Sequence, residues 1–349
     1  MSGAEAAAID WPRRAPAIFG CAGLRLSPAE RAFFAETLPV GFILFGRNVD
    51  QPAQVAALVD ELRGAVADPA VPVFIDQEGG RVARLKPPHW RAAPAAARFG
   101  ELYAQDPARA CAAARLNAEM IARELSALGI DADCLPLLDV RQPEADKVIG
   151  DRAFSGDPVV VAALGRAVAD GLAAGGCQGV IKHLPGHGRA GVDSHHGLPR
   201  VDAPAELLEA VDFPPFRALN DLPWGMTGHL VFSAYDTERP ATQSPAVVER
   251  VIRGTIGFDG VLMTDDIGMG ALSGSMAARS AASLAAGCDL VLHCSGKLRE
   301  MQEVAAALPP MAAAAAVRLA RTRTMRPSPP APVDSAVAAQ ELQRLLASA

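Results

Sequence analysis

The chain has 349 residues, half of them apolar, and a formal net charge of −6 at pH 7. This length fits one large domain or two ordinary ones, and the mildly acidic charge disfavours a nucleic acid or an anionic membrane as the main partner. The sequence contains no apolar run of about 18 residues, so we expect no transmembrane helix.

Short apolar runs alternate with segments of helical periodicity along the chain. The runs cover residues 17–22, 40–45, 71–76, 131–140, 179–184, 224–232, 260–265 and 289–294. The helical patterns include residues 51–67, 106–129, 157–176 and 205–221. Strands that alternate with helices in this way favour the α/β class and a single-domain (β/α)8 barrel of the TIM type. A doubly wound open sheet is the alternative, although residues 20–27 lack the Gly-rich dinucleotide fingerprint.

The C-terminal segment differs in composition from the rest of the chain. We expect residues 1–308 to form the barrel and residues 309–349 to form an Ala- and Pro-rich tail, with a linker at 327–333 before a short helix. The six cysteines are scattered without a C-x-x-C pair, which predicts free thiols in a reducing compartment. Because the N-terminus also lacks the pattern of a signal peptide, we expect a cytoplasmic protein. We also expect the protein to be a monomer.

Polar residues lie at the ends of most apolar runs. They are Asp76, Asp139, Lys182 with His183, His229, Asp265 with Asp266, and His293. In a (β/α)8 barrel the C-terminal ends of the strands meet at one rim, where the active site lies. Each residue alone has a structural explanation, since the aspartates could cap helices and His229 and His293 could be satisfied core histidines. Their convergence on one rim favours an active site, because buried charges are costly unless they are paired or used.

Residues 182–199, KHLPGHGRAGVDSHHGLP, contain four of the seven histidines of the chain. One hypothesis is a metal site that uses His183, His187, His195, His196 and Asp193, and the other is a loop that delivers a proton to a substrate. The usual metal-ligand spacings, H-x-H at a strand end or H-E-x-x-H on a helix, are missing. We therefore expect neither a metal nor another cofactor.

The same loop resembles the signature of glycoside hydrolase family 3, K-H-F-P-G-H-G…D-S-H…L-P, with Leu184 in place of the usual Phe. FIDQEGGRVARL (74–85), VIGDRAF (148–154) and GVLMTDDIGMGAL (260–272) resemble further motifs of that family in the expected order. The D-S-H loop and the chain length are similar to those of bacterial β-N-acetylhexosaminidases, which remove N-acetylglucosamine from recycled cell-wall fragments.

The resemblance implies a (β/α)8 barrel, a retaining mechanism and muropeptides that contain N-acetylglucosamine as substrates. Asp265 corresponds to the nucleophile, His195 to the general acid/base, and Asp193 to the partner of that histidine. Asp76, Arg84, Arg152, Lys182 and His183 correspond to sugar-binding positions.

The residue types suit this chemistry. A carboxylate can attack the anomeric carbon, and a histidine with a pKa near neutrality can protonate the leaving oxygen and later deprotonate water. Asp193 and His195 are separated by one residue, so both side chains can lie on the same side of an extended segment. Three alternatives remain: a phosphorylase or another β-glycosidase on the same site, a metal-dependent barrel hydrolase, and a sugar-binding protein without catalytic activity.

Overall fold

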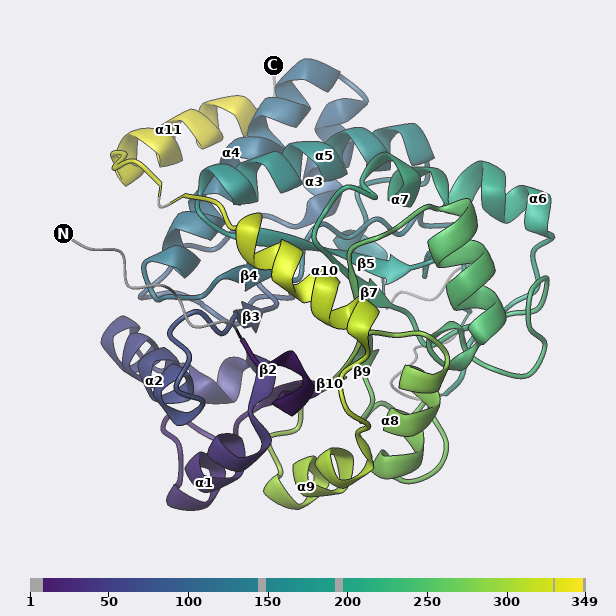
Figure 1. Ribbon diagram of the computed structural model, residues 1–349. Coiled ribbons are helices and arrows are strands. Elements are labelled where there is room, and N and C mark those ends of the chain that lie inside the picture. The colour runs from purple at the N-terminus through teal and green to yellow at the C-terminus, as the bar shows by residue number, and fades with distance from the viewer. Residues whose placement is uncertain (1–8, 144–148, 192–196, 329, 348–349) are drawn as a thin grey trace.

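The computed structural model describes residues 9–143, 149–191, 197–328 and 330–347. Within these residues, eight parallel strands form a closed barrel in the order β1-β10-β9-β7-β5-β4-β3-β2 (Figure 1). The strands are β1 (Ala15–Gly20), β2 (Pro39–Leu44), β3 (Val73–Ile75), β4 (Ala132–Asp133), β5 (Gln178–Leu184), β7 (Trp224–Thr227), β9 (Val261–Asp266) and β10 (Leu290–His293). Because β1 pairs with both β2 and β10, the sheet has no open edge, and the predicted (β/α)8 barrel is confirmed over the open sheet.

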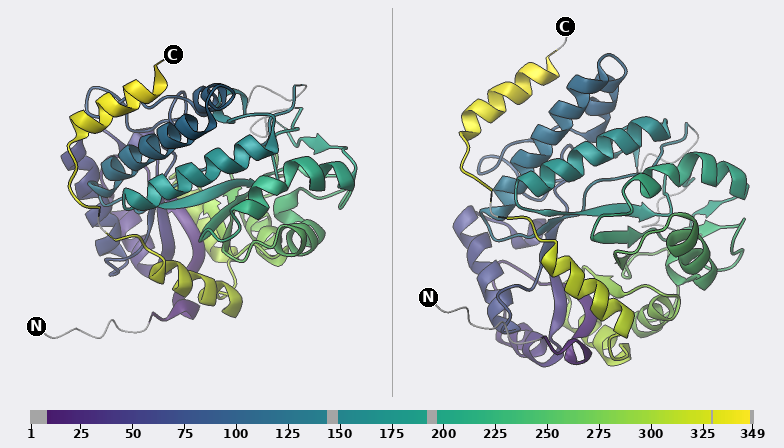
Figure 2. Two further views of the ribbon diagram at one scale, coloured as in Figure 1. Left: turned by 90° about the horizontal axis from the view of Figure 1, so that it is seen from above. Right: turned by 45° about the horizontal axis from the view of Figure 1, so that its top comes forward.

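Helices surround the barrel in both views of Figure 2. They are α1 (Pro28–Thr37), α2 (Pro52–Ala65), α3 (Ala96–Tyr103), α4 (Pro107–Ser126), α5 (Pro158–Ala174), α6 (Ala205–Leu207), α7 (Pro214–Ala218), α8 (Met276–Ala285), α9 (Leu298–Ala307), α10 (Ala313–Thr324) and α11 (Ser335–Leu346). The long helices α4 and α5 each begin at a proline that follows an aspartate, and the carboxylates of Asp106 and Asp157 cap them by accepting backbone N–H groups at 3.0 and 2.8 Å. In the part of the chain that the structure describes, no helix is both long and apolar enough to cross a membrane.

Three predicted elements are shorter or more broken than their sequence patterns indicated. The helix expected at 205–221 is divided into α6, a π-helical segment η4 (Leu208–Asp212) and α7, because Pro214 starts a new helix instead of extending the old one. The run at 131–140 contributes only the two residues of β4. The run at 224–232 ends as β7 at Thr227 and continues as β8 (Val231–Phe232), which pairs with β6 (Arg200–Val201) outside the barrel.

Helix α10 lies across the N-terminal end of the barrel, where it crosses the centre of the view in Figure 1. Leu319 and Ala315 of this helix are buried in one cluster with Val40, Trp224 and other side chains of the barrel interior. The helix therefore closes the end of the barrel opposite to the strand C-termini. It was not predicted from the sequence, whereas the division of the chain at residue 308 remains a prediction.

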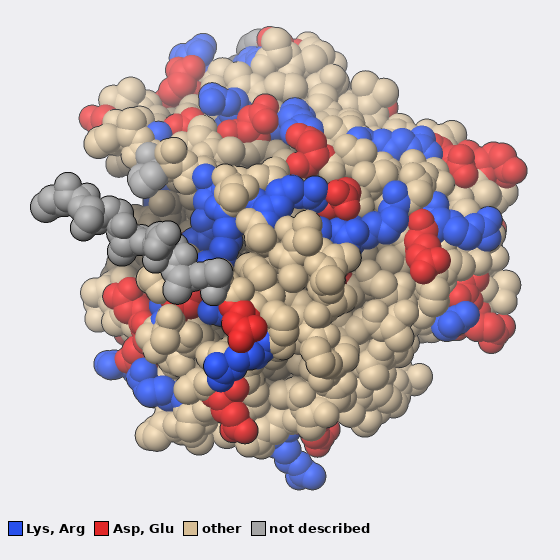
Figure 3. Space-filling view, viewed as in Figure 1, with Lys and Arg blue, Asp and Glu red and all other residues tan. Residues whose placement is uncertain are grey.

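Arginines of α10 and the segment after it form ion pairs with acidic residues of the barrel. Figure 3 shows the basic residues as a blue band across this face with red acidic residues beside it. The pairs are Arg318 with Asp259 and Asp289, Arg321 with Asp259, Arg323 with Asp68, and Arg326 with Asp131. Apolar burial and these ion pairs together anchor α10 to the N-terminal end of the barrel.

Leu319→Ala is expected to lower the free energy of unfolding by about 3 kcal/mol, since it removes a buried side chain and leaves a cavity. Val317→Ala on the same helix is the matched control, because Val317 is 68% exposed and its loss should change stability by less than about 0.5 kcal/mol. Urea unfolding of both variants measures the difference. Equal effects would show that α10 is not part of the cooperative core.

Candidate active site

A cavity of about 320 Å³ opens at the C-terminal ends of the barrel strands. Six of the predicted site residues line it: Asp76, Arg84, Arg152, Lys182, His183 and Asp265. The side chains come from β5, β9 and the loops that follow the strands, as the (β/α)8 architecture predicts. The other two, Asp193 and His195, lie outside the described residues.

The ammonium group of Lys182 lies between two carboxylates at the base of the cavity. Its Nζ is 2.9 Å from Oδ1 of Asp76 and 2.6 Å from Oε1 of Glu78, and the residue is 2% exposed. Burial lowers the pKa of Lys182, but the two carboxylates outweigh it and hold this pKa above its ordinary value. Burial likewise raises the pKa of Asp76, yet Lys182 and Arg84 hold it well below the usual range. Lys182 and Asp76 are therefore both charged at neutral pH.

Glu78 joins Lys182 to a second cation. Arg152 donates to both oxygens of Glu78, at 2.8 and 2.7 Å, which is the bidentate geometry that fixes both side chains. Burial raises the pKa of Glu78, but Lys182 and Arg152 lower it to about 2. Arg84 completes the row through Oδ2 of Asp76 at 3.0 Å. The result is one chain of fixed charges, Arg84–Asp76–Lys182–Glu78–Arg152, which we call the charge row.

A tight turn after Glu78 allows the charge row to close. Gly79 has φ +92°, and a Cβ at this position would lie 2.3 Å from the carbonyl oxygen of Pro94. Only glycine fits such a conformation and contact without strain. The turn directs the chain back so that Arg84, eight residues after Asp76, can pair with it.

Asp139 orients the first histidine of the loop at 182–199. It is fully buried, and its Oδ2 lies 2.8 Å from Nδ1 of His183. Its Oδ1 accepts the backbone N–H groups of His183 and His187 at 3.1 and 2.7 Å. Burial raises the pKa of Asp139, but His183 and the other donors lower it to about 2. Because an ionised carboxylate only accepts hydrogen bonds, Nδ1 of His183 must carry a proton.

Asp265 and Asp266 end strand β9 and both line the cavity. The backbone N–H of Asp266 donates to Oδ1 of Asp265 at 2.8 Å. Burial raises the pKa of Asp265, but His183, His229, this N–H group and Lys182 together hold it below its ordinary value. Asp265 is therefore ionised at neutral pH, as a nucleophile must be.

In the loop at 182–199, the described residues that precede Asp193 are held by contacts with the barrel. Arg189 donates to Asp212 at 2.8 Å, and a Cβ at Gly188 would lie 2.0 Å from the carbonyl oxygen of Val140. Gly188 is thus required for close packing, whereas a Cβ at Gly191 or Gly197 would meet no atom of the described residues within 4 Å.

Two residues of the site received no role from the sequence. Glu78 is two positions after Asp76, and Asp139 ends the fourth apolar run, so both were visible as polar residues near strand ends. Their partners depend on turns that a strand pattern does not specify. Among the described residues, no group of three His, Cys, Asp or Glu side chains is placed to hold a metal ion.

Asp133 lies beneath the charge row at the end of β4. It is fully buried, its Oδ1 accepts the N–H of Gln77 at 2.9 Å, and its Oδ2 has no hydrogen-bond partner in the described structure. Burial raises the pKa of Asp133 to about 8, which the nearby Asp76 and Glu78 favour and Lys182 opposes. Asp133 is therefore protonated at neutral pH.

Asp133→Asn is expected to change how stability depends on pH. An unfolded aspartate has a pKa near 4, so between about pH 4 and pH 8 only the folded chain keeps this proton, and wild-type stability falls by up to roughly 1.4 kcal/mol per pH unit from this group. The variant lacks the titration, so its free energy of unfolding should rise relative to wild type as pH increases. Urea unfolding at several pH values measures this difference, and a constant difference would contradict the raised pKa.

Comparison with known proteins agrees with this geometry. Residues 20–325 match the glycosyl hydrolase family 3 N terminal domain. A beta-hexosaminidase of Xanthomonas campestris is 40% identical over 285 residues, which cover 80% of this chain and 85% of that protein. One from Alkalilimnicola ehrlichii is 39% identical over 284 residues, 80% of each chain. Native NagZ from Neisseria gonorrhoeae has a TM-score of 0.83 at 31% identity over 96% of both chains, and a structure of NagZ from that organism in complex with zinc ion has a TM-score of 0.81 at 30% identity.

Proposed function

Because this chain belongs to glycosyl hydrolase family 3 and is a glycoside hydrolase, we propose that it removes terminal, non-reducing β-linked N-acetylglucosamine from peptidoglycan fragments with retention of configuration. The observation that carries the proposal is a single cavity that combines the ionised Asp265 with the charge row. The names of the similar beta-hexosaminidases and NagZ support the choice of sugar.

The charge row would hold the sugar. Asp76 and Glu78 offer carboxylate oxygens to sugar hydroxyls, while Arg84, Arg152 and Lys182 offer N–H donors. Since Nδ1 of His183 donates to Asp139, its Nε2 is the ring nitrogen left to meet a hydroxyl. The side chains of the charge row are already oriented by their ion pairs, so they need to move little when a sugar binds.

Asp265 would perform the first chemical step. Its Oδ1 is held by the N–H of Asp266, which leaves Oδ2 to attack the anomeric carbon. A bond forms between Oδ2 and that carbon as the bond to the leaving oxygen breaks, and the leaving oxygen takes a proton from His195. Asp193 would orient the ring of His195 and stabilise its protonated form.

Water completes the cycle in the second step. His195 removes a proton from water, the water oxygen attacks the anomeric carbon, and the bond to Asp265 breaks. The sugar leaves with its original configuration because its anomeric carbon has been inverted twice.

We place this activity in the cytoplasm, where free thiols such as the six unpaired cysteines persist. We expect the protein to act there as a monomer on recycled cell-wall fragments.

Hydrolysis of a chromogenic β-N-acetylglucosaminide beside the matching β-glucoside tests the proposal. We expect the N-acetylglucosaminide to react faster, and NMR to show the β-anomer as the first product. Equal or faster turnover of the glucoside would contradict the sugar specificity, and an α-anomer would contradict the covalent mechanism. Faster release in the presence of phosphate would instead indicate a phosphorylase.

His195→Ala is expected to reduce cleavage of a natural disaccharide far more than formation of the glycosyl-enzyme from an activated aryl glycoside. The activated group departs without a proton, so its first step depends little on the acid. The measurement is the ratio of the two losses, and a ratio near one would contradict the proton-donor role.

A zinc-dependent reaction, which the NagZ–zinc complex makes worth testing, would instead show loss of activity on chelation.

A further inference from the structure

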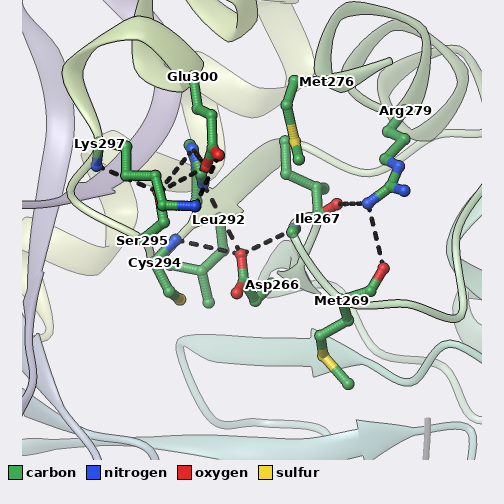
Figure 4. A network of polar contacts seen from close by, with 12 residues as sticks. Asp266, Ile267, Met269, Met276, Arg279, Leu292, Cys294, Ser295, Lys297 and Glu300 are labelled. Carbon is green, nitrogen blue, oxygen red and sulfur yellow. Dashed lines mark hydrogen bonds and ion pairs between the residues drawn. The ribbon is translucent and has the colours of Figure 1, made fainter. Parts of the chain in front are cut away.

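Asp266 lines the same cavity as Asp265, but its backbone N–H, its carbonyl oxygen and its Oδ1 hold the end of β9. Its backbone N–H donates to Asp265, and its carbonyl oxygen lies 3.0 Å from Nε2 of His229. Its Oδ1 accepts the backbone N–H groups of Gly268 and Cys294 at 2.9 and 3.1 Å. Figure 4 shows this carboxylate between Cys294 and the turn that follows β9.

The contacts of His229 determine where its proton lies. A carbonyl oxygen only accepts hydrogen bonds, so Nε2 of His229 must donate to Asp266. His229 is fully buried, and burial lowers its pKa, so the ring is neutral and Nδ1 is an acceptor. Thr242 Oγ1 lies 2.8 Å from Nδ1, 2.8 Å from Thr227 Oγ1 and 3.1 Å from the carbonyl oxygen of Gly228, which also accepts its proton. The Asp266 carbonyl therefore fixes the tautomer of His229, and the two threonine hydroxyls contact the opposite side of the ring.

We propose that His229 is a positioning residue for the nucleophile, which it holds through the main chain of Asp266. The proposal rests on the proposed function, in which Asp265 attacks the anomeric carbon. His229 is not among the residues that line the cavity, so it would act without touching the sugar. Its contact with the Asp266 carbonyl restrains the main chain of Asp266, and the N–H of that residue sets which oxygen of Asp265 faces the sugar.

The turn after β9 is supported independently on its other side. Arg279 of α8 donates to the carbonyl oxygens of Ile267 and Met269 at 2.8 and 3.1 Å, as Figure 4 shows. The N–H of Ile267 donates to the carbonyl oxygen of Leu292 at 3.0 Å. Loss of the His229 contact should therefore leave the turn folded and displace the Asp266 main chain only slightly. A small displacement of this kind reduces the rate because attack requires aligned atoms at close approach.

Two substitutions separate the contacts of His229. The amide nitrogen of Gln in H229Q can take the position of Nε2 and keep the bond to the Asp266 carbonyl. The shorter side chain of Asn in H229N reaches only the position of Nδ1 and keeps the contact with Thr242. We expect H229N to slow formation of the glycosyl-enzyme from an activated aryl N-acetylglucosaminide about tenfold more than H229Q does. Binding of free N-acetylglucosamine, measured by calorimetry, should change less than about threefold in both, because the charge row is intact.

If H229N and H229Q lose the same fraction of this rate, the proposal is overturned. A loss in proportion to the drop in melting temperature would then show that His229 has only a structural role. If either variant fails to fold, T242V and T242S replace them, since T242V removes the hydroxyl that contacts Nδ1 of His229 and T242S keeps it. T242V must then lose several-fold more of the same rate than T242S, and equal losses would overturn the proposal. Asp265→Ala is measured in parallel: if it forms the glycosyl-enzyme at the wild-type rate, the proposed function itself has failed.

Discussion

The salt bridges of the buried Lys182 ammonium with Asp76 and Glu78 are the interaction on which the site depends. A buried ion costs several kcal/mol unless it is paired, and Lys182 is 2% exposed. Its two carboxylate partners lie just beyond β3, so the pairs connect β5 to the segment after β3. Arg84 and Arg152 bind the remaining carboxylate oxygens. The free energy of pairing thus fixes, before any sugar binds, the donors and acceptors that would recognise it.

The two carboxylates at the end of β9 are held differently from those of the charge row. Asp265 accepts a hydrogen bond from a backbone N–H, which sets its orientation while leaving a full negative charge on the side chain. A direct ammonium or guanidinium partner would stabilise the carboxylate more strongly and make it a poorer nucleophile. The site therefore combines strongly paired carboxylates that suit binding with a weakly held carboxylate that suits attack.

The sequence predicted the barrel and the convergence of Asp76, Lys182, His183 and Asp265, because strand C-termini must meet at one rim. It did not predict that Glu78 bridges two cations, since that contact depends on the φ +92° turn at Gly79. It also did not predict α10, whose Ala-rich sequence offers few large apolar side chains to define a buried face. Patterns of side chains locate strands and helices well, whereas contacts made through the main chain, such as that of His229, require the folded structure.

In the proposed mechanism Asp265, and not its neighbour Asp266, bonds covalently to the sugar. The most direct measurement is peptide mass analysis after reaction with a 5-fluoro-N-acetylglucosaminyl fluoride, whose fluoride leaves readily while the electron-poor sugar slows hydrolysis of the intermediate. We expect one added sugar on the peptide that contains residues 265 and 266, with fragmentation placing it on Asp265. A sugar on Asp266, or an inactivated protein with no added sugar, would contradict it.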